Sequence, residues 1–291
     1  MSVFNRKVIL FCMYIDTHAH INFNAYREDG EDVIRDSLNN DVWMIVVGAD
    51  YKTSKRALDY ANKYEGGVHA AVGLHPMHLF QFRAETEDYD FHTRGEEFNY
   101  GVYEKLASFP KVVAIGEIGL DYYHMDIGLD IQKVKAAQRE AFWQQLLLAR
   151  TLDIPALIHC RQAHDDMLAV LKEFRKEHRR LIPANRPWGV MHCFSGDEDL
   201  AWQYFNLGMI ISFTGIVTFS RQWDDLIRKV PNNKFMIETD CPFLTPEPHR
   251  GERNVPVYVK HVAKRIAEIK KIEPEKVAEM TTRTARDFFR I

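Results

Sequence analysis

Short, continuous apolar runs recur along the chain, and segments with helical periodicity separate them. Such runs are typical of parallel strands that are buried on both faces, whereas strands with one solvated face alternate apolar and polar residues. The sequence therefore predicts eight strands, at Tyr14–Thr17, Trp43–Gly48, Val68–Gly73, Val112–Gly116, Pro155–His159, Trp188–His192, Met209–Phe213 and Phe235–Glu238.

Two of the intervening segments show the helical stripe most clearly. Apolar residues recur at steps of three, four and seven within Gln132–Leu152, and a similar stripe from Val259 to Ile269 predicts the last long helix. Eight strand–helix units in 291 residues, without a Pro- or Gly-rich linker between halves, predict an α/β fold, a single (β/α)8 TIM-like barrel. We expect this barrel over residues 14–291, with 1–13 as an N-terminal extension. A doubly wound open sheet is the alternative, because the strand count alone does not exclude it.

One connection is longer than the others. Residues 81–101, after the third predicted strand, show no clean helical period and carry six acidic residues against two basic ones. Structureless loops of this length are uncommon unless they are functional or disordered. We expect this acidic segment to leave the carboxyl end of the barrel and to restrict access there.

Composition narrows the class of protein. The chain has 38 Lys and Arg against 41 Asp and Glu, a net charge of −3, whereas a protein that binds a bare polyanion usually has a basic excess. Any contact with nucleic acid must therefore be local or assisted by bound cations. Four cysteines make no disulfide framework in a chain this long, which favours a reduced, cytoplasmic compartment. No apolar run reaches the roughly 20 residues that cross a membrane, and no obligate protein partner is indicated, so we expect a monomer.

Metal-binding residue types fall at the ends of the predicted strands. The carboxyl ends of barrel strands share one face, where barrel enzymes place their chemistry. Alternate residues of a strand share a side, so an H-x-H pair directs both imidazoles the same way. Taken singly, each such residue is as readily explained by hydrogen bonds in the core. Their shared location favours a metal site, with six candidate ligands: His18, His20, Glu117, His159, His192 and Asp240.

Six ligands exceed the typical three that a protein gives to one catalytic zinc ion. They suffice for two divalent cations if one carboxylate bridges, and Glu117 is central enough in strand order to do so. Imidazole and carboxylate together suit Zn²⁺, Mn²⁺ and Mg²⁺. Two such ions roughly 3.5–4 Å apart can activate a shared water and offset charge on the attacking and leaving oxygens. This arrangement suits hydrolysis of phosphodiesters.

Short motifs surround these residues: YIDTHAH at 14–20, GEIGLDYY at 116–123, IHCR at 158–161, MHCFSG at 191–196, ETDCP at 238–242 and TPEPHRGERN at 245–254. Together they resemble the motifs of TatD-type metal-dependent hydrolases, the TatD deoxyribonuclease family of the amidohydrolase superfamily. The resemblance runs from about residue 14 to near the C-terminus. It implies a TIM-like barrel, two divalent cations (Mg²⁺, Mn²⁺ or Zn²⁺), and a deoxyribonuclease that is often a 3′→5′ exonuclease.

The resemblance also implies roles for the candidate ligands. Glu117 would bridge the two ions. Asp240 would also be the general base, because a carboxylate beside the activated water can take its proton. The remaining ligands would divide between one ion held by His18, His20 and Asp240 and another held by His159 and His192.

Three further residues are candidates for binding the DNA substrate. Arg161 and Arg250 are expected to contact phosphate, because a guanidinium offers bidentate hydrogen bonds to that group. His75 is expected in the substrate pocket. Support of the barrel mouth through hydrogen bonds to loop backbone is the alternative role for all three. Some relatives hydrolyse D-aminoacyl-tRNA, so deacylation of tRNA is the alternative activity. A non-catalytic metal- or nucleic-acid-binding protein is a third possibility.

Overall fold

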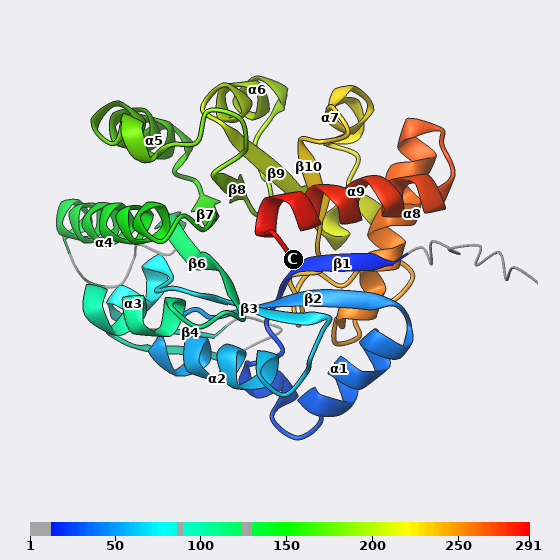
Figure 1. Ribbon diagram of the computed structural model, residues 1–291, viewed down its shortest axis with the longest axis horizontal. Helices are drawn as coiled ribbons and strands as arrows, with labels where there is room; N and C mark the ends of the chain where they lie inside the picture. Colours follow the sequence, from blue (N-terminus) through cyan, green and yellow to red (C-terminus); the bar gives the residue numbers. More distant parts are fainter. Residues whose placement is uncertain (1–12, 86–89, 124–127, 129) are drawn as a thin grey trace, which may run out of the picture.

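A single sheet of eight parallel strands forms the centre of the molecule. The computed structural model describes residues 13–85, 90–123, 128 and 130–291. The sheet curls into a nearly closed barrel (Figure 1), which confirms the predicted (β/α)8 fold over the open sheet. In spatial order the strands are β1 (Tyr14–Ala19), β2 (Val42–Val47), β3 (Val68–Val72), β6 (Val112–Asp121), β7 (Ala156–Arg161), β8 (Gly189–Met191), β9 (Met209–Phe213) and β10 (Phe235–Ile237).

The two edge strands of this sheet, β1 and β10, meet with little pairing. Among the described residues they share no ladder of paired positions, and the closure rests on an isolated bridge between Ala19 and Cys241. Two backbone hydrogen bonds of 2.9 Å cross the same seam, from His20 N–H to the Cys241 carbonyl and from Asp240 N–H to the His18 carbonyl. The barrel therefore closes just where predicted metal ligands lie on both edges.

Helices cover the outside of the barrel (Figure 1). The predicted helix over 132–152 is confirmed within one residue at each end. None of the described helices has the length and apolar character needed to cross a bilayer. The helices are α1 (Gly30–Asn39), α2 (Tyr51–Ala61), α3 (Tyr100–Ala107), α4 (Ile131–Thr151), α5 (His164–Glu177), α6 (Glu198–Asn206), α7 (Asp224–Lys229), α8 (Val259–Lys270) and α9 (Pro274–Phe289).

The C-terminal helix α9 corrects one prediction. The stripe from Val259 to Ile269 is buried on α8 as expected, but α8 is not the last long helix, because the 16-residue α9 follows it. The buried face of α9 includes threonines, which weaken the apolar stripe. The hydroxyl of Thr281, for example, is satisfied inside the helix by the Val277 carbonyl at 2.9 Å.

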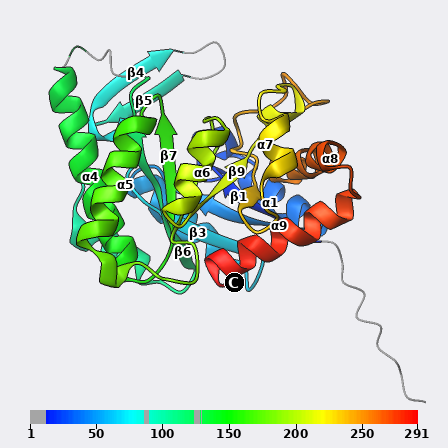
Figure 2. The same ribbon diagram turned by 90° about the horizontal axis from the view of Figure 1, so that it is seen from above.

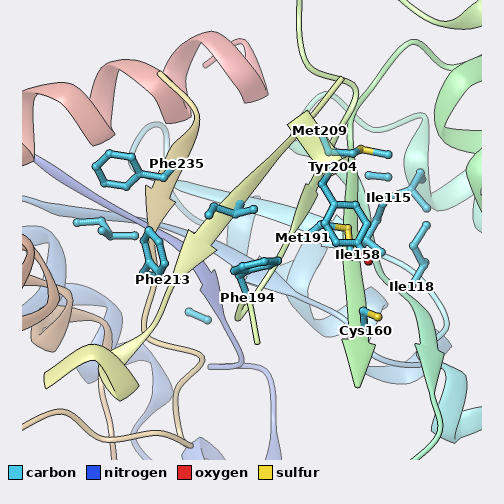
Figure 3. Close-up of a cluster of buried hydrophobic side chains, with 14 of the residues drawn as sticks. Ile115, Ile118, Ile158, Cys160, Met191, Phe194, Tyr204, Met209, Phe213 and Phe235 are labelled. Carbon is cyan, nitrogen blue, oxygen red and sulfur yellow. The ribbon is translucent and has the colours of Figure 1, made fainter. Parts of the chain in front are cut away.

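Helix α9 closes one end of the barrel. Residues from the strands, among them Ile45 and Leu157, form one buried cluster with Phe288 and Phe289 of α9. Figure 2 shows α9 across the end of the barrel opposite to the projecting β4–β5 hairpin. A larger buried cluster joins the strands to the surrounding helices, and Figure 3 shows part of it across β6 to β10. With one end closed, chemistry is confined to the carboxyl end of the strands.

The segment after β3 differs from the predicted loop. Strands β4 (Gln81–Glu85) and β5 (Asp90–Arg94) pair as an antiparallel hairpin within 81–101. Polar and apolar residues alternate along Gln81–Glu85, which is the signal of a strand and is missed by a search for helical period.

The acidic charge of this segment is in part structural. Glu96 accepts hydrogen bonds from the Tyr51 N–H at 3.1 Å and from the Tyr103 hydroxyl at 2.6 Å. The predicted restriction of access depends largely on side chains at 82–92, outside the described ones, and stays a prediction. Residues 1–12 of the expected N-terminal extension also lie outside the described residues.

Candidate metal centre

The six predicted ligands come together at the carboxyl end of the barrel. A cavity of about 840 Å³ opens there and is lined by all of them except His18, which is fully buried beneath it. The sequence analysis expected the fourth strand to end at Gly116, just before Glu117. In the structure, β6 continues to Asp121, with a register irregularity between Ile115 and Ile118. Of the other ligands, His18 lies within β1, His159 within β7, and His20, His192 and Asp240 just beyond β1, β8 and β10.

Four of these side chains have the spacing of a coordination shell. The Nε2 atoms of His18 and His20 lie 3.1 Å apart, and each lies 3.5 Å from Oε2 of Glu117. Oδ1 of Asp240 lies 3.8 Å from His18 Nε2 and 3.4 Å from His20 Nε2. Ligands held tetrahedrally at about 2.1 Å from one ion are about 3.4 Å from each other. The donors of His18 and His20 therefore have separations that fit a divalent cation, both with Asp240 and with Oε2 of Glu117.

The second carboxylate oxygen of Glu117 faces a different pair of imidazoles. Oε1 lies 2.9 Å from Nδ1 of His159 and 2.8 Å from Nε2 of His192. The two oxygens of Glu117 are thus divided between two histidine pairs, which is the arrangement of a bridging carboxylate. On this side the contacts have hydrogen-bond length, so a second cation would replace direct imidazole–carboxylate hydrogen bonds.

Asp121 is a member of this cluster that the sequence analysis did not name as a candidate ligand. Its Oδ2 lies 3.0 Å from Nε2 of His159, and donor atoms of Asp121, His159 and His75 lie within 4.8 Å of one another. The signal was present in the sequence, because Glu117 and Asp121 are four residues apart and alternate residues of one strand share a side. It was missed because β6 was expected to end at Gly116.

Buried groups behind the ligands orient them. Nδ1 of His20 lies 2.9 Å from the Val47 carbonyl, so this nitrogen donates its proton there and Nε2 keeps its lone pair for the cluster. Nδ1 of His192 lies 3.3 Å from Oε1 of Glu238. Asp16, fully buried, accepts the N–H of His18 at 3.3 Å. Asp16 and Glu238 were missed as functional residues, although both lie within the motifs quoted above.

The electrostatics of the cluster keep its acids ionised. Burial raises the pKa of Glu117, but the charges of His192 and His75 outweigh it and hold that pKa well below its usual value. Burial likewise raises the pKa of Asp240, and the hydrogen bond from His20 outweighs it, with a net lowering.

The pKa of the His159 imidazole shifts upward, whereas the pKa values of Glu117 and Asp240 shift downward. Burial lowers the pKa of His159, but its hydrogen bonds to Asp121 and Glu117 outweigh it and raise that pKa to about 9. Protons on such imidazoles balance the carboxylates, and a cation would displace them, because metal ligands must be deprotonated.

The three candidate substrate residues lie in different surroundings. His75 is buried, with Nε2 3.5 Å from Oε1 of Glu117, so it belongs to the ligand cluster as much as to the cavity wall. Arg161 and Arg250 are exposed and line the cavity. Arg250 also donates to the Thr245 carbonyl at 2.9 Å, which is the scaffold contact considered as its alternative role.

The barrel and its imidazole–carboxylate centre define the class of metal-dependent hydrolases. The family model for TatD related DNase matches residues 15–290, and the chain belongs to this family. It is 38% identical over 282 residues to the uncharacterized metal-dependent hydrolase YabD of Bacillus subtilis, covering 96% of this chain and 100% of YabD. It is 31% identical over 283 residues to the uncharacterized metal-dependent hydrolase YcfH of Escherichia coli, covering 95% and 96%. The crystal structure of the E. coli TatD homologue YjjV matches with a TM-score of 0.79 at 26% identity, covering 96% and 99%.

Proposed function

We propose that this chain is a divalent-metal-dependent deoxyribonuclease that removes nucleotides from DNA ends in the 3′→5′ direction. The observation that carries the proposal is the division of the Glu117 oxygens between His18 and His20 on one side and His159 and His192 on the other. Two bound cations would supply charge that offsets the anionic phosphodiester and would activate the attacking water. The description of the family as related to DNases supports DNA as the substrate.

Four side chains at the cavity have roles in this proposal. The Asp240 carboxylate is ionised and its side chain is 14% exposed, so it can accept the proton of the attacking water. Glu117 contacts both histidine pairs and fixes their positions relative to each other. Arg161 and Arg250 contact backbone phosphate, since guanidinium groups form paired hydrogen bonds to phosphate oxygens.

Local charge resolves the conflict between a net charge of −3 and an anionic substrate. In the part of the chain that the structure describes, neither Arg161 nor Arg250 has a carboxylate partner. Arg253, on the same cavity wall, is paired with Asp29. Two unpaired guanidiniums and bound cations concentrate positive charge where phosphate would lie, so no basic surface is needed elsewhere.

The experiment follows nucleotide release from 5′-labelled single- and double-stranded DNA with added Mg²⁺ or Mn²⁺. We expect a ladder that shortens from the unlabelled end, and its abolition in His159→Ala and Asp240→Ala with the fold retained by circular dichroism. Asp59→Ala is the matched control, because Asp59 is an exposed carboxylate on α2 paired with Lys55. A parent enzyme that leaves both DNA forms untouched with either metal would refute the nuclease.

The same preparations rank the other activities. D-aminoacyl-tRNA is assayed beside DNA under matched metal concentrations, and faster ester cleavage with no DNA cleavage would identify a deacylase. Metal-dependent binding of nucleic acid without turnover of any substrate would identify a binding protein. The binding-protein result is not expected, because all six predicted ligands are present and gathered at, or directly beneath, one cavity.

A further inference from the structure

Two guanidinium–aromatic stacks stand at the rim of the cavity. Cζ of Arg161 lies 3.8 Å from the ring centroid of Tyr123, and Cζ of Arg250 lies 4.2 Å from that of Phe219. Both arginines line the cavity. The rings behind them are 53% and 43% exposed, among the most exposed large hydrophobic side chains described.

The two stacks come from separate parts of the barrel. Arg161 ends β7 and Tyr123 follows the neighbouring β6, so the first stack belongs to one strand pair. Phe219 follows the short helix η4 (Gly215–Thr218) after β9, and Arg250 lies in the loop after β10. In the sheet order, β8 lies between these two strand pairs. The two stacks therefore belong to different strand pairs, and their arginines line the same cavity.

The two guanidiniums are used differently from most other arginines of the described chain. Many arginines of the described chain pair with carboxylates, among them Arg35, Arg139, Arg186, Arg228, Arg253 and Arg265. Arg161 and Arg250 lack such a partner in the described chain, and each is instead held against an aromatic ring. A planar cation fixed in this way presents a flat face on which another ring can stack, and its N–H groups remain able to reach phosphate.

We propose that the Tyr123–Arg161 and Phe219–Arg250 stacks are platforms for two bases of the substrate, one from each side of the bond that is cleaved. Nucleic-acid bases stack on aromatic rings and on guanidinium planes, and they do so with little dependence on sequence. Each platform therefore grips one nucleotide through its base while the cluster below acts on the phosphodiester. This inference rests on the proposed function, because it assumes a nucleic-acid substrate at this cavity.

The test changes the flatness of single bases and the rings that would receive them. The substrates are single-stranded thymidine oligonucleotides with 5,6-dihydrothymidine, whose saturated ring is not flat, at one of the last three positions from the cleaved end. The enzymes are the parent, Tyr123→Leu and Phe219→Leu. Phe109→Leu is the matched control, because Phe109 is 43% exposed and no arginine stacks on it in the described chain. Tyr123→Phe keeps the ring and serves as the rescue variant.

For the natural oligonucleotide we expect Tyr123→Leu and Phe219→Leu to raise KM by about 5- to 100-fold with kcat little changed, because base stacking contributes to binding. Tyr123→Phe and Phe109→Leu keep the KM of the parent. For each leucine variant, the dihydrothymidine penalty disappears at one position and persists at the other, which identifies the base that each stack holds.

Failures of the two proposals give different results. If the parent is active and both leucine variants have the same KM as the parent, the stacking platforms are overturned and the proposed function is not. A dihydrothymidine penalty that both variants retain at every position would do the same. A parent that cleaves no oligonucleotide would overturn the proposed function, and the platforms with it.

Discussion

Asp16 on β1 accepts a hydrogen bond from the backbone N–H of Thr239, beyond the end of β10, at 2.9 Å between Asp16 Oδ1 and Thr239 N. The same oxygen faces the N–H of His18 at 3.3 Å. One buried carboxylate thus holds two chain segments that lie 223 residues apart in sequence and carry His18 and Asp240. Asp16 therefore positions candidate ligands on both sides of the seam.

Replacing this carboxylate should loosen the metal site. We expect Asp16→Ala to weaken binding of Mn²⁺ by about 10- to 100-fold, as is typical when a group behind the ligands is lost. Each backbone donor left buried without a partner costs a further 1–3 kcal/mol or so of stability. Titration calorimetry and urea unfolding measure the two effects. Asp16→Asn, which keeps one acceptor, should fall between the parent and Asp16→Ala; equal Mn²⁺ affinity in all three proteins would contradict the role.

The two halves of the metal centre should be separable by stoichiometry. The parent should retain about two Mn²⁺ ions per chain after gel filtration, Asp240→Ala about one, and Glu117→Ala fewer than one, because Glu117 faces both histidine pairs. Elemental analysis of the eluted protein measures this. Full loading of Glu117→Ala would show that the carboxylate does not bridge.

His69, in β3, should make stability depend on pH. Burial, with a smaller effect from the charge of Lys111, lowers the pKa of His69 to about 4. The folded protein therefore keeps His69 neutral, while the unfolded chain binds a proton below about pH 6.5. His69 therefore leaves the free energy of unfolding unchanged above pH 6.5 and lowers it progressively as the pH falls toward 4.

In the variant His69→Leu, neither the folded nor the unfolded chain binds a proton at this position. We expect its free energy of unfolding in urea to fall less steeply than that of the parent between pH 6.5 and pH 4. Above pH 7 the two proteins should show parallel behaviour, which is the internal control. Curves that stay parallel down to pH 4 would show that His69 does not contribute.

The closed end of the barrel should support stability without touching the chemistry. Phe288→Ala removes a buried ring from the cluster that α9 forms with the strands, and should lower the free energy of unfolding by about 3–5 kcal/mol. Phe109→Ala, at a 43% exposed position, should change it by less than about 0.5 kcal/mol. Retained Mn²⁺ stoichiometry in both variants checks that the site is intact, and similar losses of stability in both would refute the prediction.

The barrel was predictable because its strands are buried on both faces and so read as apolar runs. The hairpin within 81–101 was not, because neither of its strands forms an apolar run. The length of β6 was missed for a related reason: its polar positions Glu117 and Asp121 interrupt the apolar run that marks the rest of the strand.

The candidate ligands were predictable from their places at strand ends, because the barrel brings those ends to one face. The residues behind them were not. Asp16 and Glu238 act through Thr239 and His192, and such contacts join β1, β8 and β10 across the fold. The backbone groups that a buried carboxylate meets depend on the register of neighbouring strands. That register cannot be read from a single sequence.

The sparse pairing between β1 and β10 gives the metal centre a second consequence. His18 and His20 belong to one margin of the sheet and Asp240 to the other, with the Ala19–Cys241 bridge between them. A cation coordinated by all three would fasten the first strand of the barrel to the last. Dissociation of that cation and local opening of the β1–β10 seam would then be linked equilibria. Any change that increases the affinity for the cation would also stabilise the seam against opening.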